Sequence, residues 1–391
     1  MFSARTNWKL TRNRLTQAID EARRSGAQVL DLTVSNPTRV GLKYDDPRIL
    51  QSLGSPAAMD YDPQPKGLLS ALTAIAEYYQ SQHGIALNPE RVILTTSTSE
   101  GYSFVFRLLC NPGDELLVPK PSYPLFEFLA DLQDVKLVPY PLIYDHGWQI
   151  DFHSLRNSIT RKARAVVVVH PNNPTGSFVH NEERESLNAI CHENGLAVVA
   201  DEVFLDYGLG GASQASFVAN DDVLSFTLSG VSKISALPQM KVAWVAASGP
   251  STEVERAMER LEVIADTYLS MNAPIQWATP ALLEQRHSVQ HQLLGRVSAN
   301  LAELDRQLAL QTMCQRLIVE GGWYAVLRVP VTQSDEELAV ELVRRESVLV
   351  HPGHFYDFPS DGHLVISLIN LEEEFAEGLG RVLQRMGSEN H

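Results

Sequence analysis

The sequence predicts an α/β fold in which a large domain holds a mostly parallel sheet and a smaller α+β domain follows it. Between about residues 60 and 250, short β-branched runs alternate with helical patterns, as expected for βα units around a parallel sheet. Two of these runs, 165–169 and 196–200, are apolar without alternation, which is typical of central strands covered on both faces. A chain of 391 residues is long enough for about two domains.

The elements can be placed in chain order from these patterns. A helical pattern occurs at about 8–24, and the strands of the large sheet are expected at 91–95, 115–118, 136–140, 163–169, 196–200, 223–228 and 242–247. Two further helical patterns follow, the second at about 281–310 and long enough to connect two lobes. The smaller domain is expected to contain strands at 321–328, 346–350 and 363–368 and a helix near 335–345.

The composition limits the class of protein. Hydrophobic residues make up 44% and charged residues 20% of the chain, and no apolar run approaches the ~20 residues that span a membrane. The formal net charge of −15 disfavours nucleic acids and anionic membranes as partners. The cysteines are widely spaced and odd in number, which indicates reduced thiols. Since the N-terminus lacks the apolar segment of a secretory signal, we expect a cytoplasmic protein.

Chemically useful side chains follow several of the predicted strands. Ligands of open α/β sheets bind beyond the carboxyl ends of the strands, and Asn173, Asp201 and Lys233 stand at such positions. An amine there can form a Schiff base with an aldehyde cofactor when its surroundings lower its pKa. Most lysines are solvated surface charges, so this interpretation of Lys233 depends on the groups near the same edge.

A site for pyridoxal phosphate needs an acid, a hydrogen-bond donor, a stacking ring and a phosphate cradle. Asp201, Asn173 and Tyr123 are candidates for the first three, and their alternatives are a helix cap, a polar turn and a core tyrosine. The segment 95–101 follows a strand and begins a helical pattern, so its hydroxyl and N–H groups form either an anion site or a simple N-cap. Lys241 offers a compensating cation, or is an ordinary surface lysine.

These motifs resemble the class I/II aminotransferases, fold type I enzymes that depend on pyridoxal phosphate. They are Pro-Ser-Tyr-Pro at 121–124, Pro-Asn-Asn-Pro-Thr-Gly at 171–176, Asp-Glu-Val-Phe at 201–204, and Ser-Lys at 232–233 with a cation eight residues later. The resemblance runs from about residue 30 to the C-terminus. We therefore expect an N-terminal segment at 1–50 that joins the small domain, a large cofactor-binding domain at 51–275 and a small C-terminal domain at 276–391.

The resemblance implies a role for each residue at the centre of the site. Lys233 would form the Schiff base and would move the proton between the substrate Cα and the cofactor. Asp201 would pair with the pyridine nitrogen, Asn173 would bond the phenolic oxygen, and Tyr123 would stack on the ring.

The resemblance also implies how the phosphate is held. Thr98, Ser99 and Lys241 match phosphate ligands of the family within this chain. Tyr61 matches a tyrosine that reaches the phosphate bound by the partner subunit, so the resemblance implies a homodimer.

The chain departs from the family pattern around the cofactor. Phe204 stands where a tyrosine usually bonds the phenolic oxygen, and one such bond is worth about 1 kcal/mol. Gly230 replaces a hydroxyl residue before the lysine. Lys241 replaces an arginine, which keeps the charge but loses the bidentate fork.

A further departure concerns the substrate. The family carries an arginine that binds the substrate α-carboxylate, and here the matching residue is Val365. A charged hydrogen bond contributes about 1.5–3 kcal/mol, so we expect another cation to substitute. Arg39 and Arg328 are the candidates for substrate binding, although Arg328 is equally well read as a surface residue at a strand end.

The resulting hypothesis is an aminotransferase that moves an amino group between an α-amino acid and a 2-oxo acid by a ping-pong mechanism through the Lys233 Schiff base. The alternative is a β-eliminating C–S lyase on the same cofactor, which the missing arginine favours. A non-catalytic relative has no sequence support because Lys233 and Asp201 are both present. His351, His354 and His363 form a poor ligand set, so we expect no metal.

Overall fold

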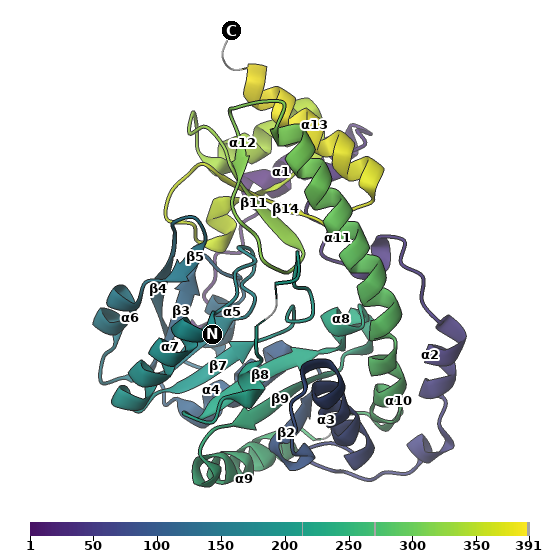
Figure 1. Cartoon of the computed structure of the whole chain (residues 1–391), viewed down its shortest axis with the longest axis vertical. Helices are drawn as coiled ribbons and strands as arrows, with labels where there is room; N and C mark the ends of the chain where they lie inside the picture. Colours follow the sequence, from purple (N-terminus) through teal and green to yellow (C-terminus); the bar gives the residue numbers. More distant parts are fainter. Residues whose placement is uncertain (213, 270, 389–391) are drawn as a thin grey trace.

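The computed structural model describes residues 1–212, 214–269 and 271–388. Residues 213, 270 and 389–391 lie outside the described residues, and the last three of them belong to the predicted small C-terminal domain. In the described chain, an eight-stranded sheet and a four-stranded sheet occupy opposite ends of the molecule, with long helices between and around them (Figure 1).

The large sheet is the scaffold of the molecule. Its strand order is β2-β9-β8-β7-β6-β3-β4-β5. The bounds are β2 (Val92–Thr95), β3 (Glu115–Lys120), β4 (Lys136–Tyr144), β5 (Trp148–Ile150), β6 (Ala163–Val169), β7 (Ala197–Asp201), β8 (Ser225–Gly230) and β9 (Ala243–Ser248). The strands from β8 to β4 in this order pair in parallel, whereas β9 is antiparallel to β2 and β8, and β5 is antiparallel to β4. The predicted α/β class with a mostly parallel sheet is therefore confirmed.

The central strands are covered on both faces, as their unbroken apolar sequence predicts. In β6, Val166 and Val168 pack into one buried hydrophobic cluster, while Ala165 and Val167 pack into another. Successive side chains of a strand point to opposite faces, so the two clusters lie on opposite sides of the sheet. Burial on both faces is what a run without polar alternation requires.

Helices cover both faces of this sheet. They are α2 (Asp46–Leu53), α3 (Leu69–His83), α4 (Thr98–Leu109), α5 (Phe126–Leu132), α6 (Phe152–Ser158), α7 (Asn181–Asn194), α8 (Val231–Ile234), α9 (Ser251–Thr267) and α10 (Ala273–Glu284). Both α4 and α9 contribute to the cluster that contains Val167, whereas α3 and α10 pack against the β2–β9 end of the sheet (Figure 1). None of the described helices has the length and apolar character needed to cross a bilayer.

The smaller sheet is antiparallel, with the order β10-β11-β14-β13. Its strands are β10 (Gln315–Arg316), β11 (Tyr324–Arg328), β13 (His351–Pro352) and β14 (His363–Ser367). The surrounding helices are α1 (Arg14–Arg24), α11 (Arg286–Leu308), α12 (Asp335–Glu341), a π-helical turn (Leu342–Glu346) and α13 (Glu372–Ser388). Figure 1 shows α11 running from α8 and α10, beside the large sheet, to α13 at the other end of the molecule, so this helix connects the two parts.

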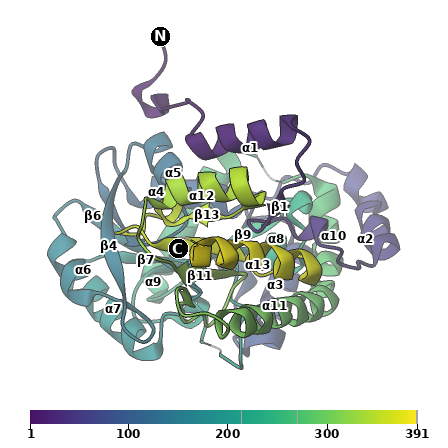
Figure 2. The same ribbon diagram turned by 90° about the horizontal axis from the view of Figure 1, so that it is seen from above.

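The N-terminal segment lies against the C-terminal elements. Strand β1 (Leu30–Asp31) pairs in parallel with β12 (Val348–Leu349), and Figure 2 shows α1 beside α12. This pairing attaches the N-terminal segment to an element near the C-terminus. The domain boundaries at residues 50 and 275 stay a prediction.

Most predicted strands coincide with observed ones, and the exceptions are short. Strands β1, β5, β10, β12 and β13 have two or three residues each, which is too few for a period-two pattern to be recognised. Of these, β12 lies within a predicted strand and the other four were not expected. Short β13 matters for function, because it carries a residue of the candidate site.

Candidate functional site

A cavity of about 300 Å³ lies between the two sheets. One wall contains Val169, Asp201 and Gly230, the last residues of β6, β7 and β8. The opposite wall comes from the smaller sheet and the 3₁₀ turn Gly353–Tyr356 that follows β13. The cavity therefore lies at the carboxyl ends of the parallel strands, where the fold class predicts a ligand site.

Lys233 projects into this cavity from α8, the short helix that follows β8. Its Nζ lies 4.6 Å from the centre of the Trp323 ring and 5.4 Å from that of Phe204, and it donates a hydrogen bond of 3.4 Å to the Ser35 carbonyl. Burial lowers the pKa of Lys233 to about 8, and the negative charge of Asp201 partly offsets this. A substantial fraction of the amine is therefore neutral near pH 8 and available for carbonyl or proton-transfer chemistry.

Asp201 is a buried carboxylate held in one orientation. Its Oδ2 accepts a hydrogen bond of 3.0 Å from the Tyr102 hydroxyl, and its Oδ1 accepts one of 3.2 Å from the Val203 N–H. Burial raises the pKa of Asp201 to about 6, although these bonds and the charge of Lys233 act in the opposite direction. The carboxylate is ionised at neutral pH and is poorly solvated, so a cationic or protonated ligand group would be bound there.

The loop that contains Asn173 is held in shape by a hydrogen bond of the preceding residue, Asn172. The Asn172 side chain accepts a hydrogen bond of 3.0 Å from the Thr175 hydroxyl, and a Cβ at Gly176 would lie 2.3 Å from Val319, so only glycine fits there. The buried Oδ1 of Asn173 has no hydrogen-bond partner among the described residues. An amide of fixed position with an unused polar atom suits a ligand that completes its hydrogen bonding.

The amino end of α4 forms a second polar wall. Ser97 caps the helix by accepting a hydrogen bond of 3.2 Å from the Glu100 N–H, and the Gly101 N–H makes the first intrahelical bond, to the Ser97 carbonyl. The N–H groups of Thr98 and Ser99 precede that bond and are the usual donors to an anion. Ser97 and Thr98 line the cavity, whereas Ser99 does not.

One of the departures from the expected pattern, Gly230, has a steric explanation. A Cβ at Gly230 would lie 2.7 Å from the Val242 carbonyl oxygen, so no side chain with a hydroxyl fits at this position. Ser232, the residue directly before Lys233, carries a hydroxyl and lines the cavity. The ring of Phe204 packs 5.2 Å from that of Trp323, in the aromatic cluster beneath Lys233.

The structure brings together Thr98, Tyr123, Asn173, Asp201 and Lys233, which all line the one cavity. The cavity wall does not include the other residues predicted from the sequence.

Apart from Ser99, which is half-buried, those other residues lie at the surface. Lys241 is exposed and has a left-handed φ of 55°, two residues before the cavity-lining Ala243. Tyr61 is 81% exposed and lines a separate surface hollow. Arg39 is exposed at the end of a 3₁₀ turn, and the guanidinium of Arg328 lies 5.6 Å from the centre of the Tyr144 ring. The predicted roles of Ser99 and of these residues stay predictions.

Several lining residues were not singled out from the sequence. Tyr324, Phe355 and Tyr356 form the wall on the side of the smaller sheet, and Ser35 closes one end near Lys233. His351 was considered only as a metal ligand, yet it lines the cavity. Of these residues, only His351 stood out in the sequence, as one of three histidines near the C-terminus. The aromatic residues lie in short strands and turns, where no sequence pattern separates a cavity residue from a core residue.

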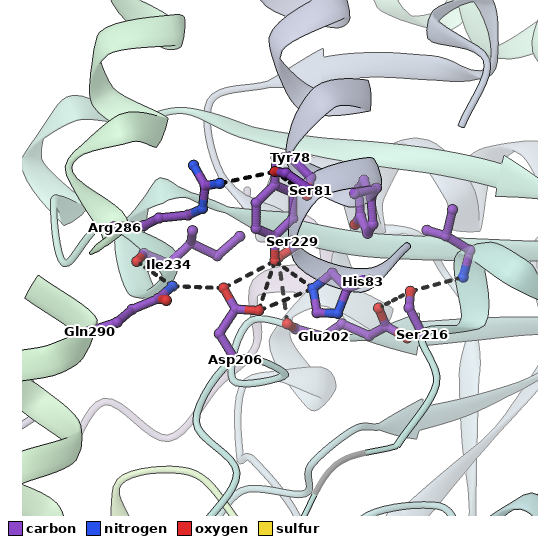
Figure 3. Close-up of polar contacts among 12 residues, drawn as sticks. Tyr78, Ser81, His83, Glu202, Asp206, Ser216, Ser229, Ile234, Arg286 and Gln290 are labelled. Atoms are coloured by element: carbon purple, nitrogen blue, oxygen red, sulfur yellow. Dashed lines mark hydrogen bonds and ion pairs between the residues drawn. The ribbon is translucent and has the colours of Figure 1, made fainter. Parts of the chain in front are cut away.

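A buried polar network lies on the other side of α8 and joins four separate segments (Figure 3). The Tyr78 hydroxyl donates to Asp206 at 3.0 Å, and His83 Nε2 lies 3.1 Å from the same carboxylate. Gln290 donates from Nε2 to Asp206 at 2.7 Å and to the Ile234 carbonyl at 2.9 Å. The network therefore fixes the end of the helix that carries the cavity lysine.

The same side of the sheet holds Glu202, the residue after Asp201. Its carboxylate accepts a hydrogen bond of 2.6 Å from the Ser216 hydroxyl (Figure 3) and one of 2.5 Å from the Phe217 N–H. Burial raises the pKa of Glu202 to about 7. In addition, the Tyr207 hydroxyl donates a hydrogen bond of 2.6 Å to the Lys233 carbonyl. The α8 backbone is thus held from behind by groups that do not line the cavity.

Comparison with known proteins gives a consistent family. The model of the aminotransferase class I and II family matches residues 58–377. The glutamate-pyruvate aminotransferase of Haemophilus influenzae is 29% identical over 92% of this chain and 91% of the relative. The alanine aminotransferase of Mycobacterium bovis is 27% identical over 91% of this chain and 85% of the relative.

Solved structures agree in fold. An aminotransferase from Escherichia coli superposes with a TM-score of 0.88 at 25% identity, over 99% of this chain and 98% of that one. Alanine aminotransferase from Pyrococcus furiosus gives a TM-score of 0.90 at 22% identity, over 99% and 100% of the two chains. The chain belongs to the class I and II aminotransferases, and the fold type I architecture implied by the motifs is confirmed.

Proposed function

We propose that this aminotransferase moves an amino group between an α-amino acid and a 2-oxo acid, with pyridoxal phosphate, in two half-reactions that share one site. The observation that carries the proposal is the meeting of Lys233 and Asp201 in one cavity at the carboxyl ends of β7 and β8. An amine with a pKa of about 8 and a buried carboxylate are the two groups that this chemistry requires.

The residues of the cavity fit this cofactor. Lys233 would bond its aldehyde carbon as a Schiff base, Asp201 would face the pyridine nitrogen, and Tyr123 would stack on the ring. Because the oxygen and nitrogen of a side-chain amide exchange places by a flip, the unpartnered end of Asn173 can donate to a phenolic oxygen. The amino end of α4 at Thr98 would hold the phosphate, with Ser99 and Lys241 as further proposed contributors.

The side chains then divide the work of the reaction. When bound, pyridoxal phosphate supplies an electron sink for the charge that develops at the substrate Cα. The Lys233 amine would accept the proton from the substrate Cα and donate it to the carbon of the cofactor that carried the aldehyde oxygen, since its lowered pKa lets it exchange protons close to neutral pH. Asp201, ionised above about pH 6, stabilises a protonated pyridine nitrogen. The aromatic wall that includes Phe204 and Tyr324 limits the access of water to these groups.

The relatives suggest which substrates to test first. Two of them are named glutamate-pyruvate aminotransferase and alanine aminotransferase, so we propose alanine with pyruvate, and glutamate with 2-oxoglutarate, as candidate pairs. Each of the relatives described above is named an aminotransferase, so the β-eliminating C–S lyase, which the missing arginine at Val365 favours, gains no support from them.

We also propose a homodimer in which Tyr61 reaches the phosphate held by the partner subunit. Tyr61 is 81% exposed, and Met59 and Leu69, within eight residues of it in sequence, are 87% and 65% exposed, so this segment offers apolar side chains for a second subunit to cover. Light scattering of the purified chain measures the mass in solution. A dimer in which Tyr61→Phe weakens cofactor binding supports this arrangement, and a monomer with full activity contradicts it.

We also propose a cytoplasmic location. Cys110, Cys191 and Cys314 are free thiols, which suits a reducing compartment. Fractionation of cells that express the tagged chain tests this location directly.

The central test uses the chain reconstituted with pyridoxal phosphate. With one amino acid and no acceptor, an aminotransferase stops after one turnover, and the absorbance of the bound cofactor changes once. A lyase would instead release ammonia and pyruvate continuously. Continuous release, or the absence of any spectral change over a broad panel of amino acids, would refute the proposed function. Lys233→Ala is expected to abolish the change, since the amine is lost.

A further inference from the structure

The position where the family carries its carboxylate-binding arginine faces a histidine on the neighbouring strand. Val365, in β14, is 1% exposed and carries no charge. It pairs directly with His351 of β13 in the antiparallel register, while Val326 of β11 pairs with it on the other side. Directly opposed residues in antiparallel strands project their side chains to the same face, with Cβ atoms ~4.5–5.5 Å apart. His351 therefore stands one strand away from the usual arginine, on the same face of the sheet.

The imidazole of His351 is oriented by a second cavity residue. Its Nδ1 lies 2.9 Å from the Tyr356 hydroxyl, and both residues line the cavity. Burial raises the pKa of Tyr356 well above its usual value, so the phenol keeps its proton and can donate it to Nδ1. The other nitrogen, Nε2, then carries a hydrogen. Among the described residues, nothing accepts a hydrogen bond from Nε2, which leaves it available to a ligand.

No other basic side chain is available within the cavity. Lys233 and His351 are the only basic side chains among the described residues that line it, and Lys233 is assigned to the cofactor. Arg39 and Arg328, the candidates from sequence, do not line it. An α-carboxylate bound near the cofactor therefore has one basic partner in this chain.

We propose that His351, held by Tyr356, binds the α-carboxylate of the substrate in place of the family's arginine. This inference rests on the proposed aminotransferase function, because it concerns the substrate of the same cavity. A single imidazole N–H cannot form the bidentate fork of a guanidinium, so it holds a carboxylate less firmly. The enzyme would accordingly bind amino acids more weakly than relatives that keep the arginine.

The experiment compares substrates with and without the carboxylate. Wild type, His351→Ala and the control His354→Ala are reconstituted with pyridoxal phosphate, and the absorbance of the bound cofactor is followed during titration. His354 is a suitable control because it is exposed in the 3₁₀ turn that directly follows β13 and does not line the cavity. The paired probes are L-alanine with ethylamine, and L-phenylalanine with 2-phenylethylamine, where each amine lacks only the carboxylate.

A carboxylate contact predicts a selective loss. In His351→Ala, half-saturation by the amino acids should need about 10- to 100-fold higher concentration, the loss expected for one charged hydrogen bond. Half-saturation by the amines should stay within about twofold, since they make no such bond. His354→Ala should match wild type with every probe. Pyruvate binding measured by calorimetry gives a second readout, and His351→Ala should weaken it by a similar factor.

Two results would overturn the assignment while leaving the proposed function intact. Equal weakening of amino acids and amines in His351→Ala would indicate a general disturbance of the cavity. Unchanged amino-acid binding in His351→Ala, together with a loss in Arg39→Ala, would identify Arg39 as the anchor. Failure of wild type to bind any carboxylated probe, including pyruvate, would overturn both the assignment and the proposed function. By contrast, pyruvate binding that depends on His351 without amino transfer would refute only the proposed function.

Discussion

Asp201 and Glu202 are consecutive carboxylates at the end of β7, and they lie in two different environments. Asp201 lines the cavity and accepts two hydrogen bonds within the protein, from Tyr102 and Val203. Glu202 points away from the cavity and accepts bonds from Ser216 and the Phe217 N–H. Burial raises the pKa of both, to about 6 and about 7.

The same contrast holds for the other polar groups of the site, which either face the cavity or bond the protein behind it. On the cavity side, Asp201, Asn173 and the amino end of α4 carry polar groups that face open space. On the far side, Gln290 donates hydrogen bonds to Asp206 and to the Ile234 carbonyl of α8 (Figure 3). The cavity side is therefore suited to bind a ligand, and the far side to hold Lys233 in place.

The largest expected effect comes from the cavity side. Asp201→Asn removes the charge that stabilises a protonated pyridine nitrogen, so we expect kcat for amino transfer to fall about 100- to 1000-fold. Glu202→Gln is the matched control, with an equally small change one residue away, and should keep kcat within about threefold. Steady-state kinetics with saturating cofactor measures both. Equal losses of kcat in Asp201→Asn and Glu202→Gln would contradict the division into a ligand-binding side and a supporting side.

Glu202, on the far side, is expected to act on the pH dependence of the unfolding free energy and not on kcat. Glu202 has a usual pKa of 4.5 and a folded pKa of about 7, so the folded state binds its proton more tightly than the unfolded state. Its contribution to stability is complete below about pH 4.5 and is lost as the pH rises through 7. We expect the unfolding free energy of the cofactor-free wild type to fall by about 3 kcal/mol more than that of Glu202→Gln over this interval. Urea unfolding at several pH values measures it, and parallel curves would contradict the assignment.

A steric test concerns the turn that leads into α8. Gly230→Ala would place a Cβ 2.7 Å from the Val242 carbonyl oxygen, so we expect a loss of about 1–3 kcal/mol in unfolding free energy and a displaced Lys233. Gly295→Ala in α11 is the control, because nothing lies within 4 Å of its added Cβ and alanine favours a helix. Thermal unfolding separates the two. An equally stable Gly230→Ala would show that this turn is not close-packed.

The smallest effect is expected from the network behind α8. Gln290→Met removes the hydrogen bonds to Asp206 and the Ile234 carbonyl at similar side-chain volume. We expect a loss of about 1 kcal/mol in stability and a decrease of a few-fold in kcat with unchanged KM. A change in KM alone would argue that Gln290 acts on substrate binding and not through Lys233.

Much of the fold followed from local sequence. The strands β6, β7 and β8 were predicted within two residues of their observed ends, because their apolar runs are long and uninterrupted. The meeting of Asn173, Asp201 and Lys233 was also predictable, since parallel strands end at one edge of a sheet. Strands of two or three residues, such as β13, carry too little pattern to be recognised.

The sequence by itself determined the fold class, the family and the residues that follow each long strand, because each of these depends on short motifs and local periodicity. Only the tertiary structure decided what surrounds them. Tyr78, Asp206 and Gln290 meet from distant segments, and no local pattern links them. The pairing of His351 with Val365 is likewise a matter of register between two strands. Register depends on packing of the assembled sheet, which is why the replacement for the missing arginine was visible only in three dimensions.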